Sequence, residues 1–149
     1  MLVDHGLELL SEEEARELLD HSEIGRVGVT MGAIPAIFPV NYAIVDDLIV
    51  FRTAPGSKLS AATEGAVVAF EVDEFDGASR SGWSVLVVGR SQVVHDLDTT
   101  FKVLDVGLEP WADGVRSAIV RIDIEMISGR RILHQGTLNG RVPVPAAGR

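Results

Sequence analysis

The sequence predicts a mainly β fold, a small antiparallel barrel of six strands with short peripheral helices. Six runs rich in β-branched residues follow one another between residues 24 and 132, and most are bounded by Gly, Asp or Pro. The joints at residues 31–32 and 46–47 are too short for the crossover that a parallel strand pair needs. Closing an antiparallel sheet removes its exposed edges, so this pattern favours a barrel over a doubly wound sheet.

The first element is a short helix over residues 12–20. Ser11 and Glu14 have the spacing of a capping box, in which each side chain accepts a hydrogen bond from the other residue's backbone N–H. Ala15 and Leu19 begin an apolar stripe on the same helix. The acids of the first turn complement the helix dipole, so we interpret them as a solvated capping face and assign them no function.

The next three strands form a meander. The runs are IGRVGVT at 24–30, AIFPVNYAIV at 36–45 and LIVFR at 48–52. Pro39 within the second strand and Pro35 at its start remove backbone donors, so this strand should be irregular, bulged or on an edge near its start.

The remaining elements are three further strands and two short helices. We expect strands at 66–73, 83–94 and 117–132, and helices at 57–64 and 98–106. Asp98 is expected to be the N-cap of the second of these helices, because its carboxylate can accept a hydrogen bond from a first-turn N–H.

The chain of 149 residues is expected to contain one domain, at residues 1–132. Residues 133–149, LHQGTLNGRVPVPAAGR, have two prolines and no apolar periodicity. We predict that they form a flexible tail or an arm that lies on a partner.

Composition excludes several functional classes. A formal charge of -9 repels phosphate backbones, so nonspecific nucleic-acid binding is not expected. The absence of cysteine excludes disulfides, a thiolate nucleophile and a Cys-ligated zinc site, and the four histidines have no metal-binding spacing. No signal peptide or membrane-spanning apolar run is present, which predicts a cytoplasmic protein without a membrane partner. No GxSxG elbow occurs, so a hydrolase triad is not supported. No GxGxxG motif occurs, so a Rossmann site is not expected.

The most informative segment joins a predicted strand to a predicted helix. Arg52 and Thr53 end the strand, and Ser57 and Lys58 begin the helix. Free N–H groups, hydroxyls and two cations at such a junction can hold a phosphate monoester. The same spacing is also compatible with an ordinary turn whose Arg and Lys are solvated.

The chain resembles the FMN-binding split-barrel group related to pyridoxamine 5'-phosphate oxidase. The resemblance extends over residues 9–131 and rests on several short motifs in the same order. These motifs are GRVGV, FPVNY, IVFRT, SKL, VAFEVDEFD, GWSVLVVGR and ISGRR. It is strongest to the small flavin-nucleotide-binding branch that includes nitroimidazole-resistance proteins, and it implies a six-stranded antiparallel split β-barrel.

The resemblance also implies site residues. The FMN phosphate would be held by Arg52, Thr53, Ser57 and Lys58. A strand would lie along the isoalloxazine ring, made of Phe38, Pro39, Val40, Asn41 and Tyr42. Trp83 would approach the flavin from a neighbouring subunit, although plain core packing is also compatible with its position.

The function implied is that of an oxidoreductase that passes electrons from a reduced nicotinamide to a small electrophile, such as a nitro compound or a quinone. Because hydride transfer is the flavin's own chemistry, no catalytic residue and no metal ligand is nominated. A homodimer is expected, since one small subunit has too few walls to bury a flavin ring. The alternatives are a reductase that uses the deazaflavin F420, a non-enzymatic flavin or haem carrier, and a redox sensor.

Overall fold

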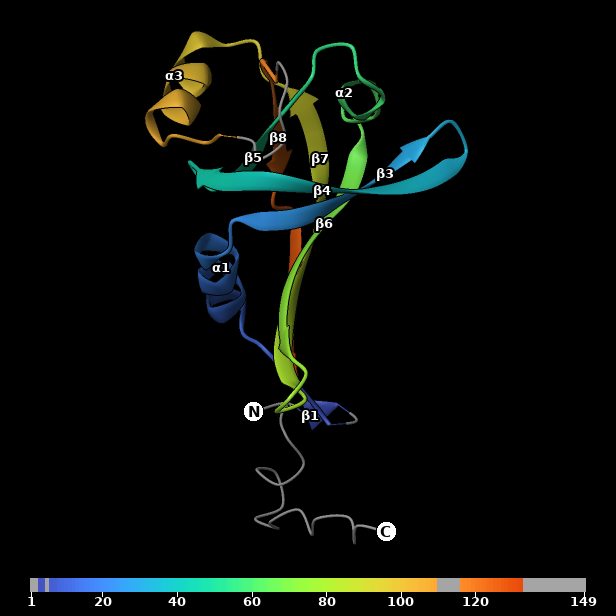
Figure 1. Ribbon diagram of the computed structural model, residues 1–149, viewed down its shortest axis with the longest axis vertical. Helices are drawn as coiled ribbons and strands as arrows, with labels where there is room; N and C mark the ends of the chain where they lie inside the picture. Colours follow the sequence, from blue (N-terminus) through green and yellow to red (C-terminus); the bar gives the residue numbers. More distant parts are fainter. Residues whose placement is uncertain (1–2, 5, 110–115, 133–149) are drawn as a thin grey trace, which may run out of the picture.

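The computed structural model describes residues 3–4, 6–109 and 116–132 (Figure 1). The tail predicted at 133–149 lies outside the described residues. The N-terminal half contains β1 (Val3–Asp4), β2 (Leu7–Leu9), α1 (Glu12–His21), β3 (Ile24–Met31), β4 (Ile34–Val45), β5 (Leu48–Thr53) and α2 (Lys58–Ala62). The C-terminal half contains β6 (Val67–Asp76), β7 (Ser81–Val93), α3 (Leu97–Asp105), β8 (Ala118–Asp123) and β9 (Met126–Ile132).

Six strands close into an antiparallel ring in the order β7-β6-β3-β4-β5-β8. The ring closes because β8 pairs with β5 on one side and with the end of β7 on the other. Strands β9, β2 and β1 extend the sheet from the first half of β7. The predicted antiparallel barrel with short peripheral helices is confirmed, and the described residues add three strands to the six that form the ring.

The run 117–132 forms two strands where the sequence predicted one. Its first part, β8, pairs with β5 and with Ser91–Val93 of β7, and its second part, β9, pairs with Gly82–Val88 of β7. One straight strand cannot follow both partners, so the chain breaks between Asp123 and Met126.

The prolines of β4 lie where that strand has one hydrogen-bonded neighbour. β4 pairs with β3 from Ile34 to Asn41, and with β5 only from Tyr42 to Val45. Pro35 and Pro39 therefore belong to an edge of the sheet, as expected, because their missing N–H groups need no partner there.

Of the two helix caps that the sequence predicted, one is confirmed and one is wrong. Ser11 and Glu14 form the capping box of α1. The prediction for Asp98 is wrong, because Asp96 is the N-cap of α3 and its carboxylate accepts from the Thr99 N–H at 2.8 Å. Asp98 instead lies in the first turn, where its charge faces the helix dipole.

The barrel encloses one main apolar core, and a second, smaller apolar cluster lies on the other face of β5. The rings of Tyr42 and Phe70 meet edge to face in the main core with centroids 4.8 Å apart, and Phe51 is buried in the same cluster. The second cluster packs Val103 of α3 against Val50 and neighbouring residues. Figure 1 shows α2 and α3 at one end of the long β6–β7 hairpin and β1 at the other. Among the described helices, none is long and apolar enough to cross a membrane.

Candidate functional site

The junction of β5 and α2 brings two hydroxyl groups together, and a lysine follows them in the chain. Thr53 Oγ1 lies 3.2 Å from Ser57 Oγ, and Ser57 also caps α2 by accepting from the Ser60 N–H at 3.1 Å. Lys58 follows as the first helical residue and is exposed. We call Thr53, Ser57 and Lys58 the β5–α2 turn.

Arg52 does not join the β5–α2 turn. Successive residues of a strand point to opposite faces, so Arg52 and Thr53 diverge. The Arg52 guanidinium donates from Nε to the Arg116 carbonyl at 2.9 Å and from Nη1 to the Leu108 carbonyl at 3.1 Å. The sequence analysis grouped Arg52 with Thr53, Ser57 and Lys58, whereas the structure places the Arg52 guanidinium on these two carbonyls.

The strand that was predicted to lie along a ring ligand divides between two faces. Phe38, Val40 and Tyr42 face the main core, whereas Pro39 and Asn41 alternate with them on the other face. A ligand outside the barrel can therefore contact the side chains of Pro39 and Asn41. It can contact only the backbone of Phe38, Val40 and Tyr42.

The Tyr42 side chain is buried in the main core. Its hydroxyl donates to the Leu19 carbonyl of α1, and burial is the main cause that raises the pKa of Tyr42 well above its ordinary value. This side chain fastens α1 to the barrel.

A hollow of about 420 Å³ lies between β4 and the segment after α3. Asn41 and Ala43 line it from β4, and Leu108 lines it from the opposite wall. Its other lining residues are Glu23, Tyr42, Val106, Gly107 and Glu109. Two carboxylates at its edge disfavour a phosphate there, whereas a neutral ring that needs hydrogen bonds is compatible with it. The sequence analysis missed the wall 106–109, because only the packing of α3 places it opposite β4.

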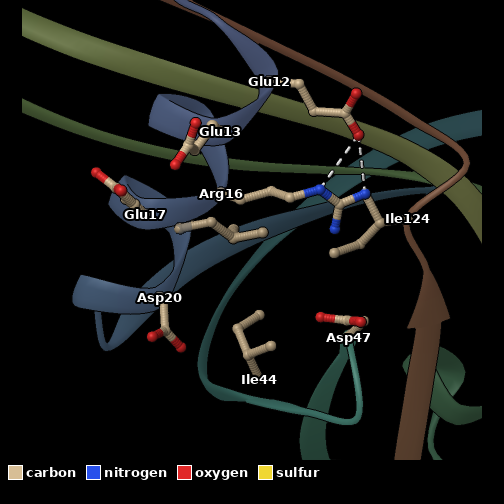
Figure 2. A pocket seen from close by; sticks show the side chains of 9 residues that line it. Glu12, Glu13, Arg16, Glu17, Asp20, Ile44, Asp47 and Ile124 are labelled. Carbon is tan, nitrogen blue, oxygen red and sulfur yellow. Dashed lines mark hydrogen bonds and ion pairs between the residues drawn. The ribbon is translucent and has the colours of Figure 1, made fainter.

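A larger hollow, of about 650 Å³, lies between α1 and the β4–β5 turn (Figure 2). Its apolar floor contains Leu19, Ile44 and Ile124, and its one cation, Arg16, is paired with Glu12 at 3.1 Å. The remaining lining residues are Glu13, Glu17, Asp20 and Asp47. This excess of negative charge repels an anionic ligand, so size alone does not make this hollow the site of a nucleotide.

The chain matches a family model described as pyridoxamine 5'-phosphate oxidase over residues 11–131. It belongs to this family. The uncharacterized protein Rv0080 of Mycobacterium tuberculosis is 37% identical over 129 residues, which cover 83% of this chain and 84% of that protein.

Two solved structures share the fold. An FAD-binding protein from Mycobacterium smegmatis superposes with a TM-score of 0.71 at 32% identity, covering 83% of this chain and 97% of that one. An FAD-binding protein from Mesorhizobium loti has a TM-score of 0.67 at 29% identity, covering 84% of this chain and 97% of that one. The resemblance noted from the sequence motifs is thereby confirmed.

Within this chain, Trp83 lies far from the β5–α2 turn. It pairs with Glu74 near the tip of the β6–β7 hairpin and packs against the main core. The chain passes from α2 into β6 at Val67, the other end of that hairpin. Seven residues of strand separate Glu74 from Val67, which corresponds to roughly 23 Å. The structure therefore does not bring Trp83 to the β5–α2 turn within this chain.

An apolar row crosses the outer face of the sheet. Directly paired residues on five neighbouring strands share this face: Met126, Val88, Ala69, Gly28 and Ile37. Met126 and Ile37, at the ends of the row, are 68% and 71% exposed. We call these five residues the outer row.

In the described ranges, no group of three or more His, Asp or Glu side chains has the arrangement of a metal site.

Proposed function

We propose that this chain binds a flavin nucleotide through its FMN moiety, with the phosphate at the β5–α2 turn and the ring along β4. The observation that carries the proposal is the contact between the Thr53 and Ser57 hydroxyls where β5 meets α2, directly before the exposed Lys58. Hydroxyl donors and an exposed ammonium together suit a phosphate monoester. The ring would lie against the outward face of β4, at the hollow lined by Asn41. The two FAD-binding relatives support a flavin, and FMN forms part of FAD.

The activity we propose is reduction of small electrophiles, nitro compounds or quinones, by a reduced nicotinamide. A bound flavin would supply the hydride acceptor and donor for this reaction. The residues of the chain would hold the phosphate, orient the ring and exclude water, so no side chain is needed as a general acid or base. Steady-state consumption of NADH or NADPH, compared with free FMN at equal concentration, tests this activity. Turnover no faster than that of free FMN would favour a flavin carrier.

The binding test uses the two lysines of the chain, Lys58 and Lys102. Lys58→Ala should weaken FMN binding about tenfold to hundredfold, because a charge-assisted contact of about 1.5–3 kcal/mol is lost. Lys102→Ala is the matched control. Lys102 lies on α3, and its Nζ forms an ion pair with Asp46 Oδ2 at 2.6 Å. Riboflavin, which has no phosphate, should bind equally well to both variants. Equal FMN affinities of the two variants would refute the phosphate site.

Absorption spectra of the purified protein and mass analysis of the released ligand identify the cofactor. Two visible flavin bands with the mass of FMN or FAD would support the proposal. The single band of a deazaflavin would indicate F420, and a Soret band would indicate haem.

A homodimer is the second part of the proposal. The hollow at β4 is partly open to solvent, and the ends of the apolar outer row, Met126 and Ile37, are largely exposed. Such a strip is typical of a subunit interface. Light scattering should report twice the monomer mass of 16.0 kDa. Ile37→Glu should shift this mass toward the monomer, and a monomeric wild-type protein with flavin bound would refute the homodimer.

A further inference from the structure

The Arg52 side chain joins two segments that are distant in sequence. Its Nε donates to the Arg116 carbonyl, just before β8, and its Nη1 donates to the Leu108 carbonyl, just after α3. The two acceptors are eight residues apart in the chain. The planar guanidinium presents its N–H groups in a fixed fork, so one side chain can hold both carbonyls in one arrangement.

This contact sets one wall of the hollow at β4. Leu108 belongs to that wall, and Asn41 belongs to the wall opposite it. β4 and β5 pair at Tyr42 and Phe51, both of which face the core. The preceding residue of β4 and the following residue of β5 are Asn41 and Arg52, which therefore share the other face. Arg52 thus stands beside one wall and binds the backbone of the other.

We propose that Arg52 is a positioning residue for the flavin ring and not a ligand of the flavin phosphate. The inference rests on the proposed flavin site and deepens it. Two of the three guanidinium nitrogens are bound to backbone carbonyls, and the side chain leaves β5 on the face opposite Thr53. The phosphate is left to Thr53, Ser57 and Lys58. Arg52 fixes the spacing between Asn41 and Leu108, where the ring lies.

The test compares FMN with riboflavin on two variants, Arg52→Lys and Arg52→Gln. A lysine keeps the charge but has a single nitrogen, so it cannot reproduce both backbone contacts. We expect both variants to lose affinity for FMN and for riboflavin by the same factor, at least fivefold. The ratio of the two dissociation constants should stay within twofold of the wild-type ratio. The absorption bands of the flavin bound to the variants should shift as the ring environment changes.

A phosphate ligand would behave differently. Arg52→Gln would then weaken FMN binding alone, and Arg52→Lys would largely restore it. That pattern overturns the proposal, as does unchanged binding of both flavins. Lys58→Ala is the internal reference, because its expected loss is confined to FMN. If wild-type protein binds neither flavin, the proposed function itself fails, and the role of Arg52 fails with it.

Folding of the variants is checked by urea unfolding. If Arg52→Gln is too unstable to measure, Arg52→Lys still distinguishes the two roles, because a phosphate site tolerates lysine and a double carbonyl contact does not. Amide hydrogen exchange in residues 106–109 gives a second measurement on the same variant. Exchange should be faster than in wild type, and unchanged exchange would contradict a contact that holds this wall.

Discussion

Gly89 lies where β7 changes partners, and its replacement by alanine tests the geometry of the closed barrel. The residues of β7 before it pair with β9, and those after Arg90 pair with β8. A Cβ atom on Gly89 would lie 1.6 Å from the Asp123 carbonyl oxygen and 2.8 Å from its carbonyl carbon. Both are backbone atoms, so no side-chain rotation relieves the clash.

The expected cost follows from this distance. An ordinary contact needs 3.4 Å, so the two backbones must separate by 1.8 Å, the difference between 3.4 and 1.6 Å. Overpacking in a rigid interior costs about 1–3 kcal/mol, and each broken backbone hydrogen bond adds about 1 kcal/mol. Alanine also lowers the conformational entropy of the unfolded chain, which by itself raises the free energy of unfolding by about 0.4–1 kcal/mol. With one such hydrogen bond broken, Gly89→Ala should therefore lower the free energy of unfolding by about 1–3.6 kcal/mol.

The assay is urea unfolding followed by far-ultraviolet circular dichroism, with Gly77→Ala as the control. A Cβ on Gly77 would meet nothing within 4 Å. The control should remain within about 0.5 kcal/mol of wild type, as surface substitutions usually do. If the Gly89 variant is as stable as the Gly77 variant, the close passage of β7 against the β8–β9 break is refuted.

Two further predictions concern buried polar groups. Burial, followed by the neighbouring Asp73, raises the pKa of Glu71 from 4.5 to about 7. The stability that this group contributes is complete below pH 4.5 and is lost as the pH rises through about 7. Glu71→Gln should thus increase the free energy of unfolding by on the order of 1 kcal/mol near pH 8, after allowance for solvent screening, and by almost nothing near pH 4.5. Urea unfolding at both values checks this, and an equal gain at both would contradict it. Tyr42→Phe removes the buried hydrogen bond to the Leu19 carbonyl and should lower the free energy of unfolding by about 1–3 kcal/mol. Thermal denaturation measures this loss. An unchanged melting temperature would show that α1 is held by apolar contacts alone.

Elements governed by local physics were predictable from the sequence. The capping box of α1 requires only Ser11 and Glu14 at the correct spacing. The turn at Asp46 and Asp47 has positive φ angles of 50° and 61°, which Asp tolerates, and it joins β4 to β5 as expected. The motif resemblance also led to the correct family, because short motifs in a fixed order are a property of the chain alone.

The sequence contained one further indication about the site. Arg52 and Thr53 are neighbours in a strand, and the two-residue period predicts that their side chains leave it on opposite faces. Their grouping with Ser57 and Lys58 followed spacing along the chain and left this alternation out. The cap of α3 was less accessible, because Asp96 and Asp98 are equivalent candidates until the Thr99 N–H is placed.

What the sequence by itself determined is therefore the six strand-forming runs, the cap of α1 and the family. The tertiary structure alone decided how the run 117–132 divides, which carbonyls Arg52 binds and which segment faces Asn41 across the hollow. Hydrogen bonds within a turn or cap depend on residues three or four positions apart, so a short window contains them. Arg52 and Leu108 are 56 positions apart, and they meet only because barrel closure brings β5, β8 and the end of α3 together.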